Sequence, residues 1–304
     1  MTPRARKTRP DAPLRLTLPY SPPYAWGELL AFHASHTTAG VEQVAGGCYR
    51  RTVEVEGVRG WLSVAPLPGA DALAAELSPS LAPVVPQVTA RLRSLFDLDA
   101  RPDVIAARLS LDPALAPVVA KRPGLRLPGS FDEFEMLVRT VLGQQISVKG
   151  ATTLAGRVAG AFGDSVVTPI AGLDRATPTA ARLAEVTTDE LKALGIVTAR
   201  ANAIRTVAVA VRDGVVKLGP TPDPEGVIAD LIKLPGIGPW TAHSVAMRAL
   251  AWPDGFPHGD LVVKRMLGTS KTRELIARAE PWRPYRGYAT MHLWFASFDG
   301  VKRI

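Results

Sequence analysis

The stretch "LPGIGPWTAHSVAMRAL", residues 234–250, decides how this chain can fold, because two glycines and two prolines come directly before an amphipathic helical run. The segment before it, "DPEGVIADLIKL" (223–234), also has helical spacing of apolar residues. Two helices joined by a short turn with glycines two residues apart are typical of a helix-hairpin-helix. A tight corner between helices that binds nothing has the same pattern, so the hairpin alone leaves both interpretations open.

The turn of this hairpin has the features of an anion site. Gly236 and Gly238 allow positive φ angles and leave no Cβ in the way. Their N–H groups, at the N-terminus of the second helix, can then approach a nucleic acid phosphate. A monovalent cation, Na⁺ or K⁺, that bridges to the same phosphate is expected on the backbone carbonyls of Ile232, Leu234 and Ile237.

An aspartate follows the hairpin in a second motif. Asp260 stands in "FPHGDLVVKRML" (256–267), 20 residues after Trp240 and directly before an apolar helical run. An aspartate in this place commonly caps the helix that it precedes. The alternative is a carboxylate at the mouth of a cleft, since a helix of about 12 residues and a short return loop could bring Trp240 and Asp260 to one opening.

Composition limits the classes of protein. The chain has 304 residues, 47% of them hydrophobic and 21% charged, which are values of globular proteins. No apolar stretch approaches the roughly 18 residues of a spanning helix, and no signal peptide is expected. The net charge of +8 favours nucleic acid as the partner. Cys48 is the one cysteine, which excludes an internal disulfide and a cysteine-ligated metal site, and a cytoplasmic enzyme is expected.

The pattern of elements changes along the chain. Apolar alternation with tight turns, flanked by two helices, predicts an α+β N-terminal domain with a small antiparallel sheet, and helical spacing then dominates to the C-terminus. The predicted parts are a basic disordered tail at 1–13, the α+β domain at 14–105, and a helical region at 106–304 that holds the hairpin at about 225–250.

The hairpin "LPGIGPWTA" followed by "HGDLVVKR" resembles the glycosylase superfamily named for its helix-hairpin-helix, Gly/Pro-rich loop and Asp. Further blocks resemble the bacterial 3-methyladenine DNA glycosylase II family, the AlkA type, and extend the resemblance over about residues 16–298. These blocks are "SPPYAWGELLAF" (21–32), "RPGLRLPGSFDEFEMLVRTVLGQQISV" (122–148), "LKALG" (191–195) and "EPWRPYRGYATMHLWF" (280–295).

The resemblance implies an N-terminal domain of antiparallel sheet with helices, followed by two helical lobes with the site between them. It implies monofunctional hydrolysis of the N-glycosidic bond of alkylated bases in duplex DNA, after the base is flipped out of the stack, within base excision repair. It also implies a monomer in the bacterial cytoplasm, associated with the nucleoid, that requires no cofactor.

Residue roles follow from the same resemblance. Asp260 matches the catalytic Asp of the family, and Trp240 and Trp294 match its aromatic pocket, where an indole face attracts a cationic base. Taken alone, Trp294 in "MHLWF" is more typical of a core residue. Ser244 replaces an aromatic residue that the family pattern expects in the pocket, which would widen the site.

The remaining predicted roles concern DNA contacts. Enzymes of the family insert an apolar side chain into the gap left by the flipped base, and that position in "LGQQISV" is Gln145, with Ile146 beside it as the alternative wedge. Lys264, Arg265 and Arg286 are expected to meet the DNA backbone. For Arg286 a solvated helix face is the competing interpretation.

Two other functions remain open at this point. One is a helix-hairpin-helix protein that grips damaged DNA without catalysis, against which Asp260, Trp240 and Trp294 all speak. The other is a bifunctional glycosylase and lyase. Such relatives carry a lysine where this hairpin has Trp240, so the amine needed for a Schiff base is missing there.

Overall fold

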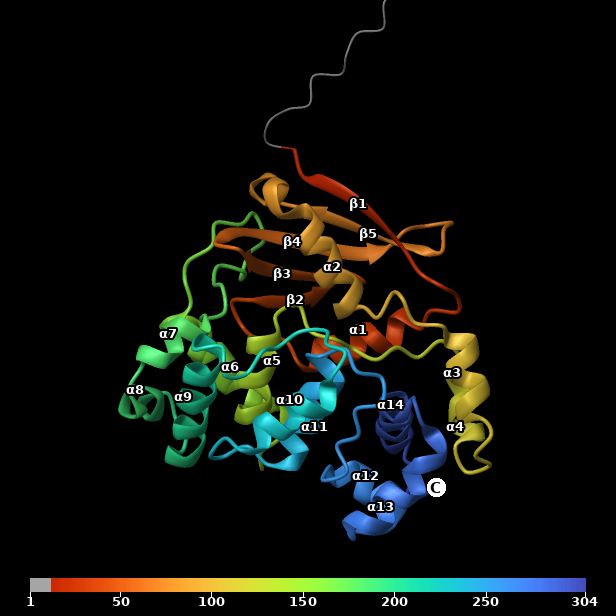
Figure 1. The fold of residues 1–304 in the computed structure, drawn as a ribbon. Helices are drawn as coiled ribbons and strands as arrows, with labels where there is room; N and C mark the ends of the chain where they lie inside the picture. The colour runs from red at the N-terminus through yellow and green to blue at the C-terminus, as the bar shows by residue number, and fades with distance from the viewer. Residues whose placement is uncertain (1–11) are drawn as a thin grey trace, which may run out of the picture.

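The structure of the protein is a computed structural model that describes residues 12–304, so the predicted N-terminal tail lies almost wholly outside the described residues. Its N-terminal part is one antiparallel sheet in the order β1-β5-β4-β3-β2, at the top of Figure 1. The strands are β1 (Leu14–Pro19), β2 (Glu42–Ala45), β3 (Cys48–Val55), β4 (Val58–Pro66) and β5 (Ala72–Leu77).

One face of the sheet is apolar and carries the core of the N-terminal part. Leu62 of β4 pairs with Leu77 of β5, and Val64 pairs with Ala75, so that all four side chains point to one face. The 3₁₀ helix η1 (Pro79–Val84) and helix α2 (Val85–Leu95) belong to the same buried cluster. The predicted α+β architecture with a small antiparallel sheet is confirmed.

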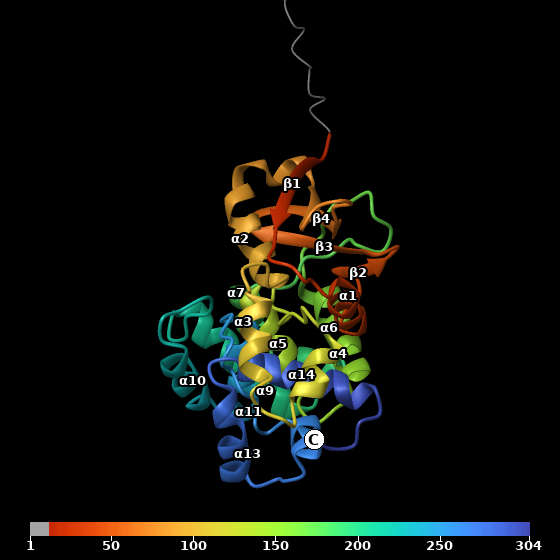
Figure 2. The same cartoon turned by 90° about the vertical axis from the view of Figure 1, so that its right-hand side faces the viewer.

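Helix α1 (Trp26–Ser35) lies between the sheet and a helical array that fills the rest of the molecule (Figures 1 and 2). None of the helices within residues 12–304 is long and apolar enough to cross a bilayer. The array consists of α3 (Pro102–Leu109), α4 (Ala116–Lys121), α5 (Glu133–Leu142), α6 (Val148–Phe162), α7 (Ala180–Glu185), α8 (Thr188–Ala193), α9 (Thr198–Arg212), α10 (Pro224–Ile232), α11 (Pro239–Arg248), α12 (Leu261–Leu267), α13 (Thr272–Ala279), the 3₁₀ helix η2 (Glu280–Trp282) and α14 (Arg286–Phe298).

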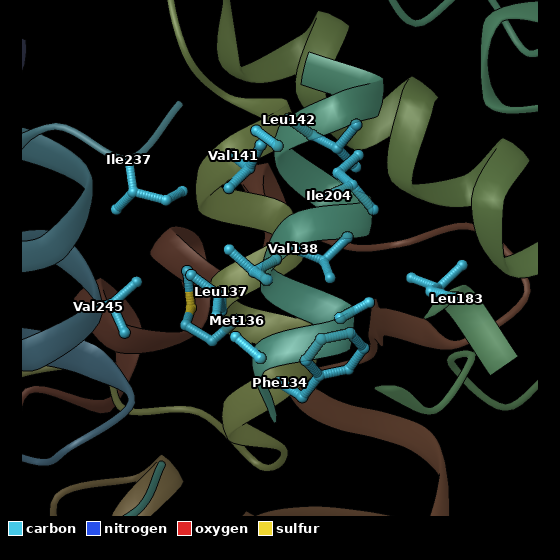
Figure 3. Close-up of a cluster of buried hydrophobic side chains, with 14 of the residues drawn as sticks. Phe134, Met136, Leu137, Val138, Val141, Leu142, Leu183, Ile204, Ile237 and Val245 are labelled. Atoms are coloured by element: carbon cyan, nitrogen blue, oxygen red, sulfur yellow. The ribbon is translucent and has the colours of Figure 1, made fainter. Parts of the chain in front are cut away.

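Helix α5 is the centre of the first helical cluster, which takes in α6 to α11. Eight of its ten residues are buried. Figure 3 shows Leu137 and Val141 flanked by Ile237 and Val245 of the hairpin on one side and by Ile204 of α9 on the other. The hairpin is therefore attached to the most buried helix of the array rather than to a mobile surface segment.

A second helical cluster joins segments that are far apart in the sequence. Helices α3 and α4 pack with α12, α13 and α14, and α4 contacts α14 directly. The indole Nε1 of Trp282 is buried and donates to Asp112 Oδ2 (2.7 Å). The boundary predicted between residues 105 and 106 falls inside α3, whose Ile105 and Leu109 both belong to this cluster.

Buried ion pairs connect the N-terminal sheet to α5. Arg51 of β3 donates to Glu135 Oε2 (2.6 Å), and Arg139 of α5 donates to Glu42 Oε2 (2.8 Å). The hydroxyl of Tyr49 donates to the other oxygen of Glu42 (2.5 Å). Burial alone would raise the pKa of Glu42, but Arg139 and Arg51 outweigh it and hold that pKa at about 2. The carboxylate is therefore ionised at neutral pH, and the sheet is held against the helix at the centre of the array.

Candidate active site

The hairpin turn between α10 and α11 uses its two glycines differently. Gly236 has a φ of +86°, and a Cβ there would lie 2.7 Å from the Cβ of Ala203. Gly238 has a φ of −95° and is the N-cap of α11, so it does not use the positive φ that a glycine allows. Nothing lies within 4 Å of the place of its Cβ, which leaves this part of the turn open. Only Gly236 needs the left-handed region, while Gly238 leaves room before the helix.

The carbonyls expected to hold a monovalent cation belong to this turn. Leu234 O accepts the N–H of Ile237 (3.1 Å), which closes the turn, and the Ile237 side chain is buried in the cluster around α5. Ile232 is the last residue of α10. Neutral carbonyl oxygens suit a monovalent cation. Within residues 12–304 no group of three or more His, Cys, Asp or Glu side chains forms a metal site. The cation site stays a prediction.

Asp260 is the N-cap of α12. Its Oδ1 accepts the backbone N–H groups of Val262 (2.9 Å) and Val263 (3.0 Å) and the indole N–H of Trp294 (3.1 Å). All three hydrogen bonds reach Oδ1, so within residues 12–304 no donor occupies Oδ2, which is open to solvent. The capping interpretation is confirmed, and it leaves one carboxylate oxygen oriented and available.

Trp240 lies beside the loop that carries Asp260. A Cβ on Gly259 would come within 2.9 Å of the Trp240 Cβ, so the first turn of α11 touches the residue before the aspartate. Ser244 is buried one helical turn further along α11, on the same face as Trp240. The structure therefore brings Trp240 and the loop of Asp260 together, and the opening between them stays a prediction.

The N-terminal helix α1 also reaches this region, which the sequence did not indicate. The ring of Phe32 lies parallel to Trp294, with 6.3 Å between centroids and 5° between planes. The ring of His36 also stacks on the ring of Phe32, with 4.2 Å between centroids. Phe32 was recognisable in the sequence only as an apolar residue with helical spacing. Its contact with α14 depends on how the sheet domain packs against the helices.

Two histidines that had no predicted role flank the site. The rings of His243 on α11 and His258, two residues before Asp260, meet edge to face at 5.2 Å. Burial, with a smaller contribution from His258, lowers the pKa of His243 to about 4. Burial also lowers the pKa of His258. Both rings are therefore neutral at pH 7, and they place no positive charge beside the loop that carries the aspartate.

The two candidate wedge residues lie in the loop between α5 and α6. Gln145 is exposed and has a φ of +55°, whereas Ile146 is half-buried against the first helical cluster. The exposed residue is thus Gln145, and Ile146 points into the fold. Gln144 was not predicted to have a role. Its amide nitrogen donates to Gly236 O (3.0 Å) and to Thr241 Oγ1 (3.0 Å), which ties this loop to the hairpin.

The three basic residues predicted to contact DNA differ in their exposure to solvent. Arg265 is exposed on α12, where it bonds to Ser297, and Lys264 is half-buried beside it. Arg286 is buried, with a side chain only 6% exposed, and its guanidinium donates twice to Asp254, at 2.8 and 2.7 Å. The prediction that Arg286 meets DNA is therefore wrong, and so is the alternative of a solvated helix face. The residue instead joins the loop before Asp260 to the start of α14.

The contact between Gly259 and Trp240 gives a first testable prediction. Gly259→Ala would place a methyl group 2.9 Å from the Trp240 Cβ, so the loop or the first turn of α11 must shift. We expect a loss of base excision of about tenfold or more, because displacement of a reacting group by about 1 Å is costly. Single-turnover excision measures it. Gly160→Ala on α6, where a Cβ meets nothing within 4 Å, is the control. Unchanged excision by the Gly259 variant would contradict the tight contact.

Comparison with known proteins shows the family to which the chain belongs. Residues 15–132 match the model of the AlkA N-terminal domain, and residues 138–275 match that of the HhH-GPD superfamily base excision DNA repair protein. The chain is 36% identical over 284 residues to DNA-3-methyladenine glycosylase 2 of Escherichia coli strain K12, covering 92% of this chain and 96% of that protein.

Two further similar proteins are a longer sequence relative and a solved structure. The chain is 37% identical over 283 residues to the probable bifunctional transcriptional activator/DNA repair enzyme AlkA of Mycobacterium tuberculosis, but spans only 56% of that protein's length. The solved 3-methyladenine DNA-glycosylase from Archaeoglobus fulgidus has a TM-score of 0.76 and 21% identity, covering 94% of this chain and 98% of that one, which shows a shared fold. The chain belongs to the AlkA-type DNA-3-methyladenine glycosylase family, within the HhH-GPD superfamily of base excision repair proteins.

Proposed function

We propose that this protein is a monofunctional DNA glycosylase that hydrolyses the N-glycosidic bond of alkylated bases, of the 3-methyladenine type, in duplex DNA. The observation that carries the proposal is the carboxylate of Asp260. One of its oxygens is held by two backbone N–H groups and an indole N–H, while the other accepts none of these bonds, and Trp240 lies against Gly259, the residue before the aspartate. Family membership supports the reaction class.

The chemistry needs one carboxylate rather than the acid and base pair of ordinary glycosidases. An alkylated purine already carries positive charge and leaves without a proton. The sugar then develops oxocarbenium character, which the fixed negative charge of Asp260 stabilises. The free Oδ2 is the atom that would face the sugar or orient the attacking water, because Oδ1 is engaged by α12 and Trp294.

The base would be selected by its charge. A flipped base with a positive charge is attracted to the faces of Trp240 and Trp294 by cation–π interaction, worth about 0.5–2 kcal/mol. Ser244 is small and buried on the same face of α11 as Trp240, which leaves more room than an aromatic residue would. Neutral His243 and His258 add no charge that would repel the cationic base.

The hairpin would hold the DNA backbone. The amides of Gly236 and Gly238 are the proposed phosphate ligands, and a monovalent cation on the carbonyls of Ile232, Leu234 and Ile237 would supply further charge for the same phosphate. Gln145 is the proposed wedge, and Lys264 and Arg265 add phosphate contacts. We propose that the protein acts as a monomer in the cytoplasm, at the nucleoid, and needs no other cofactor.

Base release tests the proposal directly. Purified protein incubated with methylated duplex DNA should release free methylated base and leave an abasic strand that breaks only after heating in alkali. Borohydride added during the reaction should trap no covalent adduct, because Trp240 offers no amine where the lyases carry lysine. Unmethylated DNA is the control.

The same assay separates the alternatives. Binding of methylated DNA without release of base would favour a protein that grips damage without catalysis. A borohydride-trapped adduct, with strand cleavage before alkali, would favour the bifunctional class. Either result would overturn the proposed monofunctional hydrolysis.

A further inference from the structure

One side chain connects two parts of the molecule that the proposed reaction uses separately. The amide nitrogen of Gln144 donates two hydrogen bonds, to the carbonyl of Gly236 and to the hydroxyl of Thr241, each 3.0 Å long. Gln144 lies in the loop directly after α5, and its partners are more than 90 residues away, in the hairpin turn and the first turn of α11. A primary amide has two N–H groups, so this geometry uses both of its donors.

Both ends of this connection are firmly placed. Thr241 is 2% exposed, and the neighbouring Ile237 is packed into the cluster around α5. The residue after Gln144 is Gln145, with a φ of +55°, a left-handed backbone conformation that is unfavourable for a non-glycine residue. A strained conformation of this kind persists only when the surroundings hold it. Gln144 directly precedes Gln145 in the chain, and its side-chain hydrogen bonds reach the hairpin.

We propose that Gln144 is a positioning residue that couples the wedge loop to the phosphate-gripping hairpin. When the hairpin engages the backbone of the DNA, Gln144 fixes the distance and direction at which the exposed side chain of Gln145 meets the base stack. The inference rests on the proposed function, since it assigns Gln145 the task of filling the gap left by a flipped base. Gln144 acts through its neighbour and does not touch the substrate itself.

The test removes both donors and keeps the length of the side chain. Gln144→Met should weaken binding to a duplex that contains an abasic site by about fivefold to tenfold, as expected for two lost hydrogen bonds of ordinary strength. Binding to an undamaged duplex of the same sequence should change by less than twofold, because the hairpin still grips phosphates. Fluorescence of 2-aminopurine next to the abasic site should report less unstacking with the variant than with the wild-type protein.

A double-mutant cycle distinguishes positioning from simple support of the fold. If Gln144 acts through the wedge, then Gln144→Met should have no further effect on abasic-site binding once Gln145 is replaced by alanine. Thr241→Val removes one of the two acceptors and should give part of the same loss. Additive effects of Gln144→Met and Gln145→Ala would overturn the proposal, and so would equal loss on damaged and undamaged DNA.

Controls keep the outcome clear. Gln87→Met makes the same substitution in α2, where the amide of Gln87 bonds to Glu56 (3.2 Å), and it should leave DNA binding unchanged. Thermal unfolding of each variant shows whether the fold is intact. Because the cycle measures binding to an abasic site, it decides the role of Gln144 even if the wild-type protein releases no base. Base release by the wild-type protein together with unaltered binding by Gln144→Met would overturn this inference alone.

Discussion

Asp260→Asn is expected to abolish base excision while it leaves folding and DNA binding nearly intact. Asparagine has the same shape, and its amide oxygen can still accept the N–H groups of Val262, Val263 and Trp294 that now reach Oδ1. What disappears is the negative charge opposite the developing sugar cation. Loss of one preorganised electrostatic partner costs about 10²–10³ in rate, and loss of a full charge costs more.

Single-turnover release of base from methylated DNA measures this effect, with binding to abasic-site DNA measured in parallel. Asp213→Asn, at the exposed end of α9, is the matched control and should excise at the wild-type rate. Binding by the Asp260 variant should hold or improve, because a carboxylate near the phosphates repels them. If Asp260→Asn excises at the wild-type rate, the carboxylate only caps α12 and the catalytic assignment fails.

Asp254→Ala is expected to lower the free energy of unfolding by about 3–5 kcal/mol, because it leaves Arg286 charged, buried and without its carboxylate. The carboxylate of Asp254 receives two hydrogen bonds from the guanidinium of Arg286 and one from Arg283, at 2.9 Å. The pair also joins the loop before Asp260 to the beginning of α14, which carries Trp294. We therefore expect base excision to fall as well, even where the variant is still folded.

Urea unfolding followed by circular dichroism measures the loss. Asp213→Ala removes an exposed pair with Arg212, whose side chain is 41% exposed, and should leave the free energy of unfolding almost unchanged. The salt dependence of DNA binding compares the roles of Lys264 and Arg286. Lys264→Ala should reduce the slope of log K against log salt by about 0.9, whereas loss of the Arg286 charge, in Arg286→Met, should leave it unchanged. A smaller slope for Arg286→Met would return that residue to the DNA surface.

Several elements were predictable because local rules determine them. Apolar alternation predicted the antiparallel sheet of the N-terminal domain, and the glycine-rich turn between two apolar helices predicted the hairpin of α10 and α11. Strand β5 was missed because its sequence, "ALAAEL", consists of good helix formers. It becomes a strand only by pairing with β1 on one side and β4 on the other, which a local pattern does not reveal.

The sequence by itself determined the α+β and helical halves, the hairpin of α10 and α11, and the capping position of Asp260, because each depends on residues close together in the chain. Only the tertiary structure decided which oxygen of Asp260 is free, since that depends on Trp294, 34 residues away. It also placed Phe32 of the sheet domain against Trp294 and turned Arg286 inward to Asp254. These contacts arise from packing between distant helices, and the charge or apolar character of a residue does not say which partner it will meet.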